Sequence, residues 1–291
     1  MLRVVFIIIL VTSGFVEAAT EKIEVKKPKP EVKETSEITD ARARAMAGSS
    51  SKFHLKFELE YEGSSVETPF ADEKYDFEKG RPGPTFMEGT FAGRYRLDKS
   101  TTIGLGSGLK VDKPFQSPEN FVMSNPYLAF NKSYRAGLWQ MYTSLKHSWY
   151  TDRSDSKFGK NTQWALDHYM VRGMRSKLSY GTVLSYEKNL FNRALNLKEY
   201  FVVDYAFAFL PFVQYRLNQK VSFRTSLGLL ALHNRKQKEE WTFFDLEPFQ
   251  SLGVSYRYNP DFYIFPYITF LPKDIRSDST TLSVKAIFSV L

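Results

Sequence analysis

The chain of 291 residues contains no cysteine. Without thiols it has no disulfide framework, no thiolate metal site and no cysteine nucleophile. Long apolar runs are also scarce. Apart from residues 4–11, no continuous apolar stretch approaches the roughly 20 residues that a helical membrane span needs. The body of the chain is therefore not expected to cross a membrane as a helix.

Recognisable chemical motifs are missing as well. We find no zinc-ligand pair, calcium loop or phosphate-binding glycine loop, so we assign no catalytic residue, no metal site and no cofactor. Gly104, Gly106 and Gly108 alternate along one face, and no helix follows them, which favours a closely packed, inward-facing strand over a nucleotide site. The net charge of +8 is spread along the chain rather than gathered in a reader motif, so a nucleic-acid partner is not expected.

The first fifty residues differ from the rest. Residues 1–18 read as a signal peptide, with Arg3 before the apolar run and small residues before Ala19. Residues 19–51 are rich in Lys, Glu and Pro and carry too little apolar surface to offset the entropy of ordering. We expect a disordered periplasmic tail there, with a transient helical turn at most over residues 39–47. Its expected role is that of a linker, or of a contact with peptidoglycan or a periplasmic protein.

From residue 52 to the end, the dominant hydrophobic period is two. Apolar side chains from Phe53 to Tyr61 alternate with polar ones, and this puts the two sets on opposite faces of a strand. The pattern recurs down the chain, and aromatic residues make up 16% of it although the mean hydropathy is negative. We expect eleven more strands, at 85–97, 101–111, 125–133, 137–150, 163–174, 177–187, 199–217, 220–232, 243–258, 262–271 and 279–291. The faces of 163–174 and 262–271 are ambiguous, and Pro211 and Pro266 interrupt their strands.

The connections alternate in length. Tight turns are expected at residues 97–100, 134–136, 218–219 and 259–261, with long links at residues 63–84, 112–124, 151–162, 188–198 and 233–242. Transmembrane barrels of the bacterial outer membrane have short periplasmic turns, longer extracellular loops and an even number of strands. The sequence therefore predicts an all-β fold, an antiparallel up-and-down transmembrane barrel of about 12 strands, with both termini in the periplasm.

Aromatic spacing agrees with a membrane-spanning barrel. Trp139 and Trp149 lie ten residues apart on one strand, as do Tyr205 and Tyr215. Ten residues rise about 34 Å along a strand, and a tilt of about 45° reduces this to roughly 24 Å, close to the ~25 Å between the aromatic girdles of such barrels. These four residues are the expected girdle positions.

The C-terminal strand, residues 281–291, resembles the assembly signal of the Gram-negative outer-membrane β-barrel superfamily, an alternating strand that usually ends in an aromatic residue. The alternation matches, but the last residue is Leu291 and the nearest aromatic is Phe288. The resemblance covers residues 52–291 as an architecture and identifies no subfamily. It implies a porin-like protein that is folded by the barrel assembly machinery and surrounded by outer-membrane lipids.

If the apolar faces contact lipid, the opposite faces line the interior. The expected pore-lining residues are Lys56, Glu58, Glu60, Glu88, Arg94, Arg96, Lys110, Lys146, Asp204, Arg224, Arg257 and Lys285. Such charges either select solutes in a narrow, water-filled pore or pair with one another and close it. A pore for small polar or anionic solutes is the leading interpretation. A closed barrel that acts as a structural protein, an adhesin or a receptor through its loops is the alternative.

Two other classes of protein are alternatives. A membrane-embedded lipid hydrolase needs a nucleophile and a base within hydrogen-bonding reach. His147 and Ser148 are adjacent on one strand and therefore point to opposite sides, and Asp167 and His168 have the same defect. No enzymatic activity is expected. A soluble barrel of the lipocalin type is the remaining, more distant alternative.

Overall fold

A computed structural model describes residues 38–71, 73–76, 81–115, 119–151, 159–173, 177–192, 202–234, 241–243, 248–259 and 261–290. The expected signal peptide and the tail as far as residue 37 lie outside this range, as does Leu291. Within these residues, no helix combines the length and the apolar composition needed to cross a membrane.

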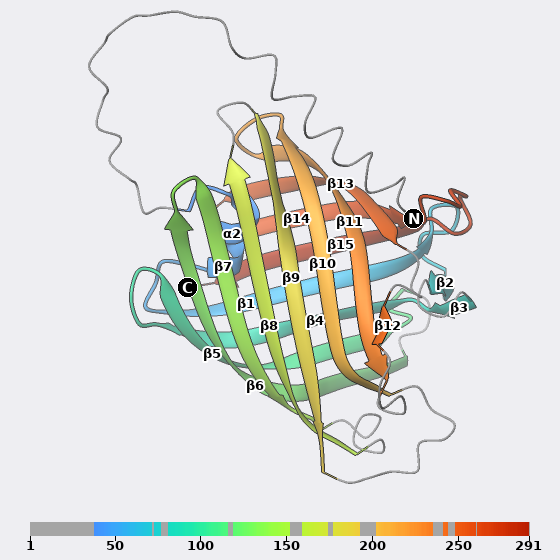
Figure 1. The fold of residues 1–291 in the computed structure, drawn as a ribbon, viewed down its shortest axis with the longest axis horizontal. Coiled ribbons are helices and arrows are strands. Elements are labelled where there is room, and N and C mark those ends of the chain that lie inside the picture. The colour runs from blue at the N-terminus through green and yellow to red at the C-terminus, as the bar shows by residue number, and fades with distance from the viewer. Residues whose placement is uncertain are drawn as a thin grey trace, which may run out of the picture. The chain divides into compact units, whose positions relative to one another are not determined.

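Twelve antiparallel strands form a closed ring, which confirms the expected number (Figure 1). Sequence neighbours pair with each other, β1 pairs with β15, and the pairing of β10 with β11 closes the circuit. The ring consists of β1 (Phe53–Ser65), β4 (Phe86–Arg96), β5 (Thr101–Asp112), β6 (Glu119–Ala136), β7 (Trp139–Trp149), β8 (Lys160–Gly173), β9 (Leu178–Phe191), β10 (Val203–Arg216), β11 (Val221–Asn234), β13 (Phe249–Asn259), β14 (Phe262–Phe270) and β15 (Thr281–Val290).

Among the described residues, three short strands lie outside the ring. The pair β2 (Glu73–Asp76) and β3 (Arg81–Pro84) forms a hairpin in the connection between β1 and β4. The third, β12 (Trp241–Phe243), pairs with the end of β11. All three belong to connections at the same end of the ring, which we call the loop end.

The opposite end, which we call the turn end, carries tight turns. Asp98 accepts hydrogen bonds through Oδ1 from the backbone N–H groups of Ser100 at 2.6 Å and Thr101 at 2.9 Å. Asn218 accepts equivalent bonds from Lys220 at 2.8 Å and Val221 at 2.9 Å. Asp and Asn favour such turns because their short side chains bond to the backbone two or three residues further on. These bonds hold the pKa of Asp98 down, at about 2.

The register separates an inner from an outer face. Lys56 of β1 lies with its ammonium group 5.9 Å from the ring centre of Tyr142 of β7, and the guanidinium of Arg224 of β11 lies 5.7 Å from the ring centre of Tyr169 of β8. These strands are not neighbours in the ring. Their side chains therefore meet across the interior, and every second residue of each strand shares this inner face.

The outer face is apolar and exposed. Large side chains there, such as Leu105 with 65% of its surface exposed, would meet water in a soluble protein. An apolar surface all around a closed barrel matches the hydrocarbon of a membrane. Others on this face are Leu55, Ile103, Leu128, Phe130, Leu145, Leu166, Val213, Phe223 and Leu252.

Both prolines inside strands point outward and interrupt the ladder on one side only. Pro211 pairs with Thr182 of β9, but the pairing of β10 with β11 skips from Phe209 to Phe212. Pro266 pairs with Val284 of β15 and has no registered partner in β13. A proline has no N–H to donate, so it is tolerated where one neighbouring strand gives up its hydrogen bonds.

In the described part of the chain, one short helix precedes the first strand, within the range 19–51 where the sequence predicted a tail with a transient helical turn over residues 39–47. Within that range, residues 38–51 are described, and α2 (Ala41–Ala47) is helical. The Asp40 side chain caps its first turn by accepting from Ala43 N at 2.9 Å, and Gly48 ends it with φ +79°. Glycine is favoured at such a C-cap because a positive φ is strained for residues with a Cβ.

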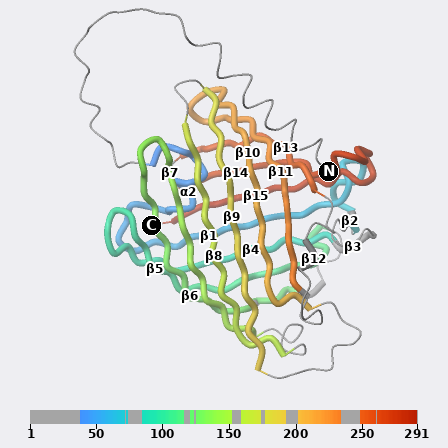
Figure 2. The backbone as a smooth tube through the Cα atoms, viewed as in Figure 1, coloured from blue at the N-terminus to red at the C-terminus, as the bar shows by residue number. Residues whose placement is uncertain are grey.

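The helix is ordered because the barrel supplies the apolar surface that the segment itself lacks. It contacts β6, β7, β14 and β15, and in Figure 2 it lies between β7 and β14. Ala43, Ala45 and Met46 are buried in one apolar cluster with inner-face side chains of the wall. These wall residues are Tyr142, Tyr169, Val171, Phe212, Tyr263, Phe265 and Ile287.

Candidate functional site on the inner wall

The inner wall carries most of the charged residues that the sequence predicted for it. Strand pairing puts three residues of β1 and three of β4 on this face, and one each of β5, β7, β11, β13 and β15. The eleven residues are Lys56, Glu58, Glu60, Glu88, Arg94, Arg96, Lys110, Lys146, Arg224, Arg257 and Lys285.

Asp204 does not share that face, so its expected orientation was wrong. The register between β10 and β11 shifts between Val203 and Tyr205, which is a β-bulge. A bulge adds one residue to one strand and so upsets the alternation. Asp204 bonds to Lys188 Nζ at 2.9 Å and approaches His233 Nδ1 at 3.8 Å, and both partners lie on the outer face with Tyr205.

Several inner charges are paired. Glu60 accepts from Lys285 Nζ at 2.8 Å and from the Tyr267 hydroxyl at 2.5 Å, which joins β1, β15 and β14. Lys56 and Glu58 lie 3.3 Å apart, and Lys110 and Asp112 lie 3.5 Å apart. The wall is therefore both charged and ordered, since each pair fixes two long side chains.

Burial of the inner charges changes along the barrel. Near the turn end, Lys56, Arg94 and Arg224 expose 7% of their surface or less. Near the loop end, Glu88 is exposed and the side chain of Lys110 exposes 44%. Solvent thus reaches the charged wall at the loop end, while the turn end is filled.

The filling at the turn end comes from residues 38–50, which sequence reasoning missed. Gln140 of β7 accepts through Oε1 from the backbone N–H groups of Thr39 at 2.7 Å and Asp40 at 2.8 Å. The hydroxyl of Tyr169 donates to Asp40 Oδ1 at 3.0 Å. The signal available in the sequence was the pair of caps, Asp40 and Gly48, on either side of a seven-residue, alanine-rich run.

Two arginines of the wall hold the other end of this segment. Arg94 donates through Nη1 to the carbonyl of Met46 at 3.0 Å, and Arg96 donates through Nη2 to the carbonyl of Ser49. Met46 lies in the last turn of α2, where carbonyl groups have no partner within the helix. Both arginines were predicted to face the interior, but their binding to a helix end was not.

A glycine on the inner face makes room for an aromatic ring. A Cβ on Gly106 would lie 2.7 Å from the Tyr127 ring and from its hydroxyl, so only glycine leaves space for this tyrosine. A Cβ on Gly104 would lie 3.2 Å from Cγ of Arg94, which is also closer than most such contacts. Gly104 and Gly106 are therefore packing features of the inner wall, as the sequence indicated.

The four expected girdle residues all lie on the outer face. Trp139 and Tyr215 lie near the turn end, while Trp149 and Tyr205 lie near the loop end. Other outward aromatics accompany them. Trp139 makes an edge contact with Tyr180, with the ring centres 5.7 Å apart. His147 lies between Trp149 at 4.8 Å and Trp164 at 4.3 Å.

The structure does not bring together the candidate residues for a lipid hydrolase. His147 is on the outer face, whereas Ser148 is on the inner face and buried. Likewise, His168 bonds to Thr143 at 2.8 Å on the outside, and Asp167 accepts from Ser185 at 2.6 Å on the inside. Neither pair forms a nucleophile and base within reach of each other.

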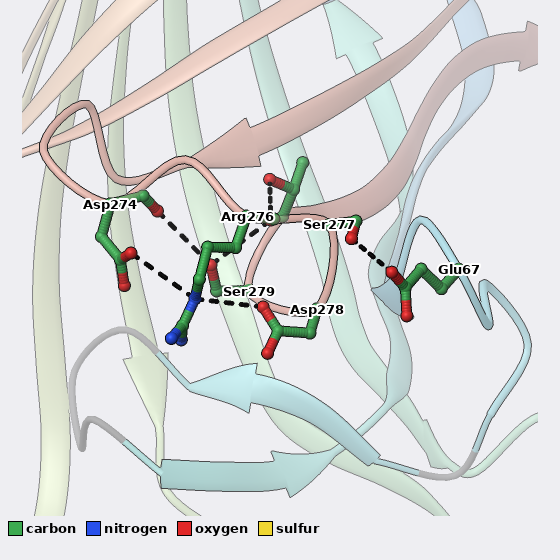
Figure 3. A network of polar contacts seen from close by, with 7 residues as sticks. Glu67, Asp274, Arg276, Ser277, Asp278 and Ser279 are labelled. Atoms are coloured by element: carbon green, nitrogen blue, oxygen red, sulfur yellow. Dashed lines mark hydrogen bonds and ion pairs between the residues drawn. The ribbon is translucent and has the colours of Figure 1, made fainter.

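The loop end carries a different kind of polar network, drawn in Figure 3. Arg276 Nε lies 3.5 Å from Asp274 and 3.2 Å from Asp278, within the connection between β14 and β15. Ser277 bonds to Glu67, in the connection that follows β1. These charged side chains are all largely exposed, so the network ties two loops together at the surface.

Solved structures share this fold. An outer membrane channel from Pseudomonas putida F1 superimposes with a TM-score of 0.51 over 84% of this chain and 98% of the other, at 10% sequence identity. The NanC porin gives 0.46 over 81% and 100%, at 12% identity, and the KdgM porin gives 0.40 over 82% and 99%, at 10%. No protein-family model matches the chain. No curated protein matches it in sequence.

The chain thus has the fold of an outer-membrane channel. At such low identity, the likeness establishes the twelve-stranded architecture and nothing finer. Together with the apolar outer face, this architecture indicates a bacterial outer-membrane protein.

Proposed function

We propose that this protein is a narrow outer-membrane channel for small polar or anionic solutes. The observation that carries the proposal is the charged inner wall of a closed barrel. Of the eleven predicted residues on that wall, eight are cationic: Lys56, Arg94, Arg96, Lys110, Lys146, Arg224, Arg257 and Lys285.

Acidic residues offset part of this charge. Glu58, Glu60 and Glu88 are the three predicted ones, and Glu62, Asp112, Asp167 and Glu187 also occupy inner positions by register. Arg135 and Arg216 add two more cations near the turn end. A modest cationic excess in a narrow passage favours anions, because the field of the wall raises their local concentration.

In the same proposal, the turn end faces the periplasm and both termini lie there. The outward aromatics near each end are the girdles at the two membrane surfaces. Outer-membrane lipids surround the barrel, and the barrel assembly machinery inserts it. The peptidoglycan layer or a periplasmic protein is the proposed contact of the tail.

Planar-bilayer recording on the refolded protein tests the function. We expect discrete conductance steps and a reversal potential, in a salt gradient, that favours anions. Lys285→Met should shift the reversal potential toward cations, because it removes an inner cation and leaves Glu60 without its partner. Lys132→Met, on the outer face, is the matched control and should leave selectivity unchanged. A membrane that stays silent with correctly folded protein would reject the channel.

A closed barrel that works through its loops is the second candidate. The packing of residues 38–50 at the turn end supports it, since a filled barrel passes nothing, and the exposed network around Arg276 gives the loops order. A binding assay with whole cells or surface ligands, before and after deletion of the loop between β1 and β4, separates it from the channel. Binding that depends on this loop, without conductance, would favour the second candidate.

A further inference from the structure

We propose that residues 38–50, including α2, are a gate that closes the barrel at its turn end and opens when the segment leaves its seat on the inner wall. This inference rests on the proposed channel function and adds the moving part to it. We call residues 38–50 the plug, and the wall residues that hold it the seat.

The seat reaches across the interior. At the start of the plug, Gln140 of β7 and Tyr169 of β8 bind Thr39 and Asp40. At its end, Arg94 of β4 binds the carbonyl of Met46. Between these points, α2 contacts β14 and β15. One short segment thus joins strands from well-separated parts of the ring, which is the arrangement that closes a passage.

The seat is specific for this segment. A Cβ on Gly48 would lie 2.5 Å from His54 Nε2, and the backbone there has φ +79°, so the wall and the plug fit only if this residue is glycine. Ala43 and Ala45 are fully buried or nearly so. A surface that fits two buried alanines and one glycine at fixed positions is shaped to the chain that occupies it.

Some interactions in the seated state are unfavourable, and they weaken the binding of the plug enough to favour reversible release. The guanidinium of Arg42 lies 5.4 Å from the Tyr169 ring centre, and that of Arg224 lies 5.7 Å from the same ring, so two cations share one confined space. The buried atoms Arg42 Nε, Arg94 Nε and Ser289 Oγ have no hydrogen-bond partner among the described residues. Water entering after release would satisfy these groups.

The plug is built to lose its structure on release. A helix of seven residues is far below the length of roughly 12–15 residues at which isolated helices become marginally stable in water. Released from the seat, α2 would unfold, and the opened segment would remain tied to β1 by the few residues from Gly48 to Phe53. This tether keeps the effective concentration high, so closing is fast.

Locking the plug is the sharpest test. The chain has no native cysteine, so the pair Thr39→Cys and Gln140→Cys offers the only two thiols. They replace residues that already bond to each other, and the short cleavable cross-linker 1,1-methanediyl bismethanethiosulfonate should join them in the refolded full-length protein. We expect cross-linking to abolish open events in planar bilayers and dithiothreitol to restore them. Each single-cysteine variant, treated identically, is the control.

Releasing the plug is the complementary test. Asp40→Ala removes both the N-cap and the bond from Tyr169, and we expect the ratio of open to closed time to rise at least about fivefold, the usual scale for loss of a cap. Tyr169→Phe, which removes one bond, should give a smaller rise. Asn218→Ala is the matched control: it removes a side chain that caps a backbone turn at the same end and bonds to Lys220 and Val221 rather than to the plug.

The outcomes are distinct. Currents that neither the cross-link nor Asp40→Ala alters would overturn the gate and leave the channel standing. Barrels that migrate as folded on heat-modifiability gels but pass no current, even after deletion of residues 38–47, would overturn the channel and the gate together. Closure by the cross-link, with reopening by dithiothreitol, supports both.

Discussion

The two ends of this barrel are held by opposite means. At the turn end, a plug and its seat bury polar groups and small apolar side chains together, with Tyr169 and Ile287 fully buried. At the loop end, ion pairs such as Arg276–Asp278 are exposed to solvent. Buried contacts contribute far more to stability than exposed ion pairs do, because solvent screens the latter. The stability of the connections should therefore be concentrated at the turn end.

The sharpest contrast between the ends is a matched pair of isoleucines. Ile287→Ala, on the inner wall beneath α2, should destabilise the folded barrel by about 2–5 kcal/mol, the cost of a cavity in a packed site. Ile275→Ala, in the loop between β14 and β15, should change it by less than about 0.5 kcal/mol, because Ile275 is 68% exposed. Urea unfolding in detergent or lipid measures both. Equal effects would break the comparison.

Gly48→Val should disturb the packing of the plug on its seat without disturbing the barrel. The added side chain meets His54 and the positive φ is unfavourable, so the strain should be about 1–3 kcal/mol and should displace the plug rather than the barrel. Limited trypsin digestion reports this, since Arg42 and Arg44 become accessible only when α2 is undocked. We expect a faster cut there with heat-modifiable migration unchanged. Protection equal to that of the native protein would show that the seat tolerates the change.

Between the two ends lies the inner ion pair Lys285–Glu60. Glu60→Gln should cost about 1 kcal/mol, because Lys285 loses a charged partner but keeps a hydrogen-bond acceptor. Because the Lys285–Glu60 pair is partly buried, we expect this loss of stability to exceed that from breaking a loop ion pair and to be smaller than that from Ile287→Ala. The midpoint of urea unfolding measures it, and Glu67→Gln in the loops serves as the exposed control.

Arg276→Ala should have a smaller effect still, below about 0.5 kcal/mol, since both of its partners are well exposed. Unfolding at low and high salt distinguishes this from a structural role: any loss should vanish at high salt. A loss of more than about 1 kcal/mol would show that the loop network stabilises the barrel as strongly as the plug does.

Asp98 gives the smallest effect, confined to acid. Its pKa is lowered to about 2 by hydrogen bonds from Ser100 and Thr101 in the turn. Folding lowers the pKa of this carboxyl group. Its contribution to the stability of the folded state is therefore fully present above the unfolded pKa of roughly 3.9 and is lost as the pH falls through about 2. Asp98→Asn should therefore flatten the acid limb of unfolding between about pH 4 and pH 2. An unchanged limb would show that the turn does not titrate with folding.

The sequence sufficed for the barrel because period two is a local signal that each strand repeats. The two strands whose faces are ambiguous in the sequence, β8 and β14, both contact the plug or lie beneath it. In β8 and β14, apolar side chains such as Val171, Tyr263 and Phe265 face inward, where α2 packs, so the pattern lost its contrast for a physical reason. The apolar–polar alternation is lost in the strands whose inner face is covered by α2.

Two features were beyond local reasoning. Part of the seat of α2 is made by residues a hundred or more positions away, as in the bond between Asp40 and Gln140, and composition alone gave the segment no reason to order. The orientation of Asp204 depends on a bulge, and one inserted residue leaves almost no trace in an alternating pattern. Pairing with distant strands, rather than propensity, decided both.

The seam between β1 and β15 has a consequence for how the protein is assembled. This junction brings together residues such as Glu60 and Lys285, 225 positions apart, so it carries the largest loop-closure entropy of the ring. The helix precedes β1 by only a few residues and travels with it. Its contacts come from β6, β7, β14 and β15, so we expect the plug to reach its seat through the turn end only after this last seam has formed.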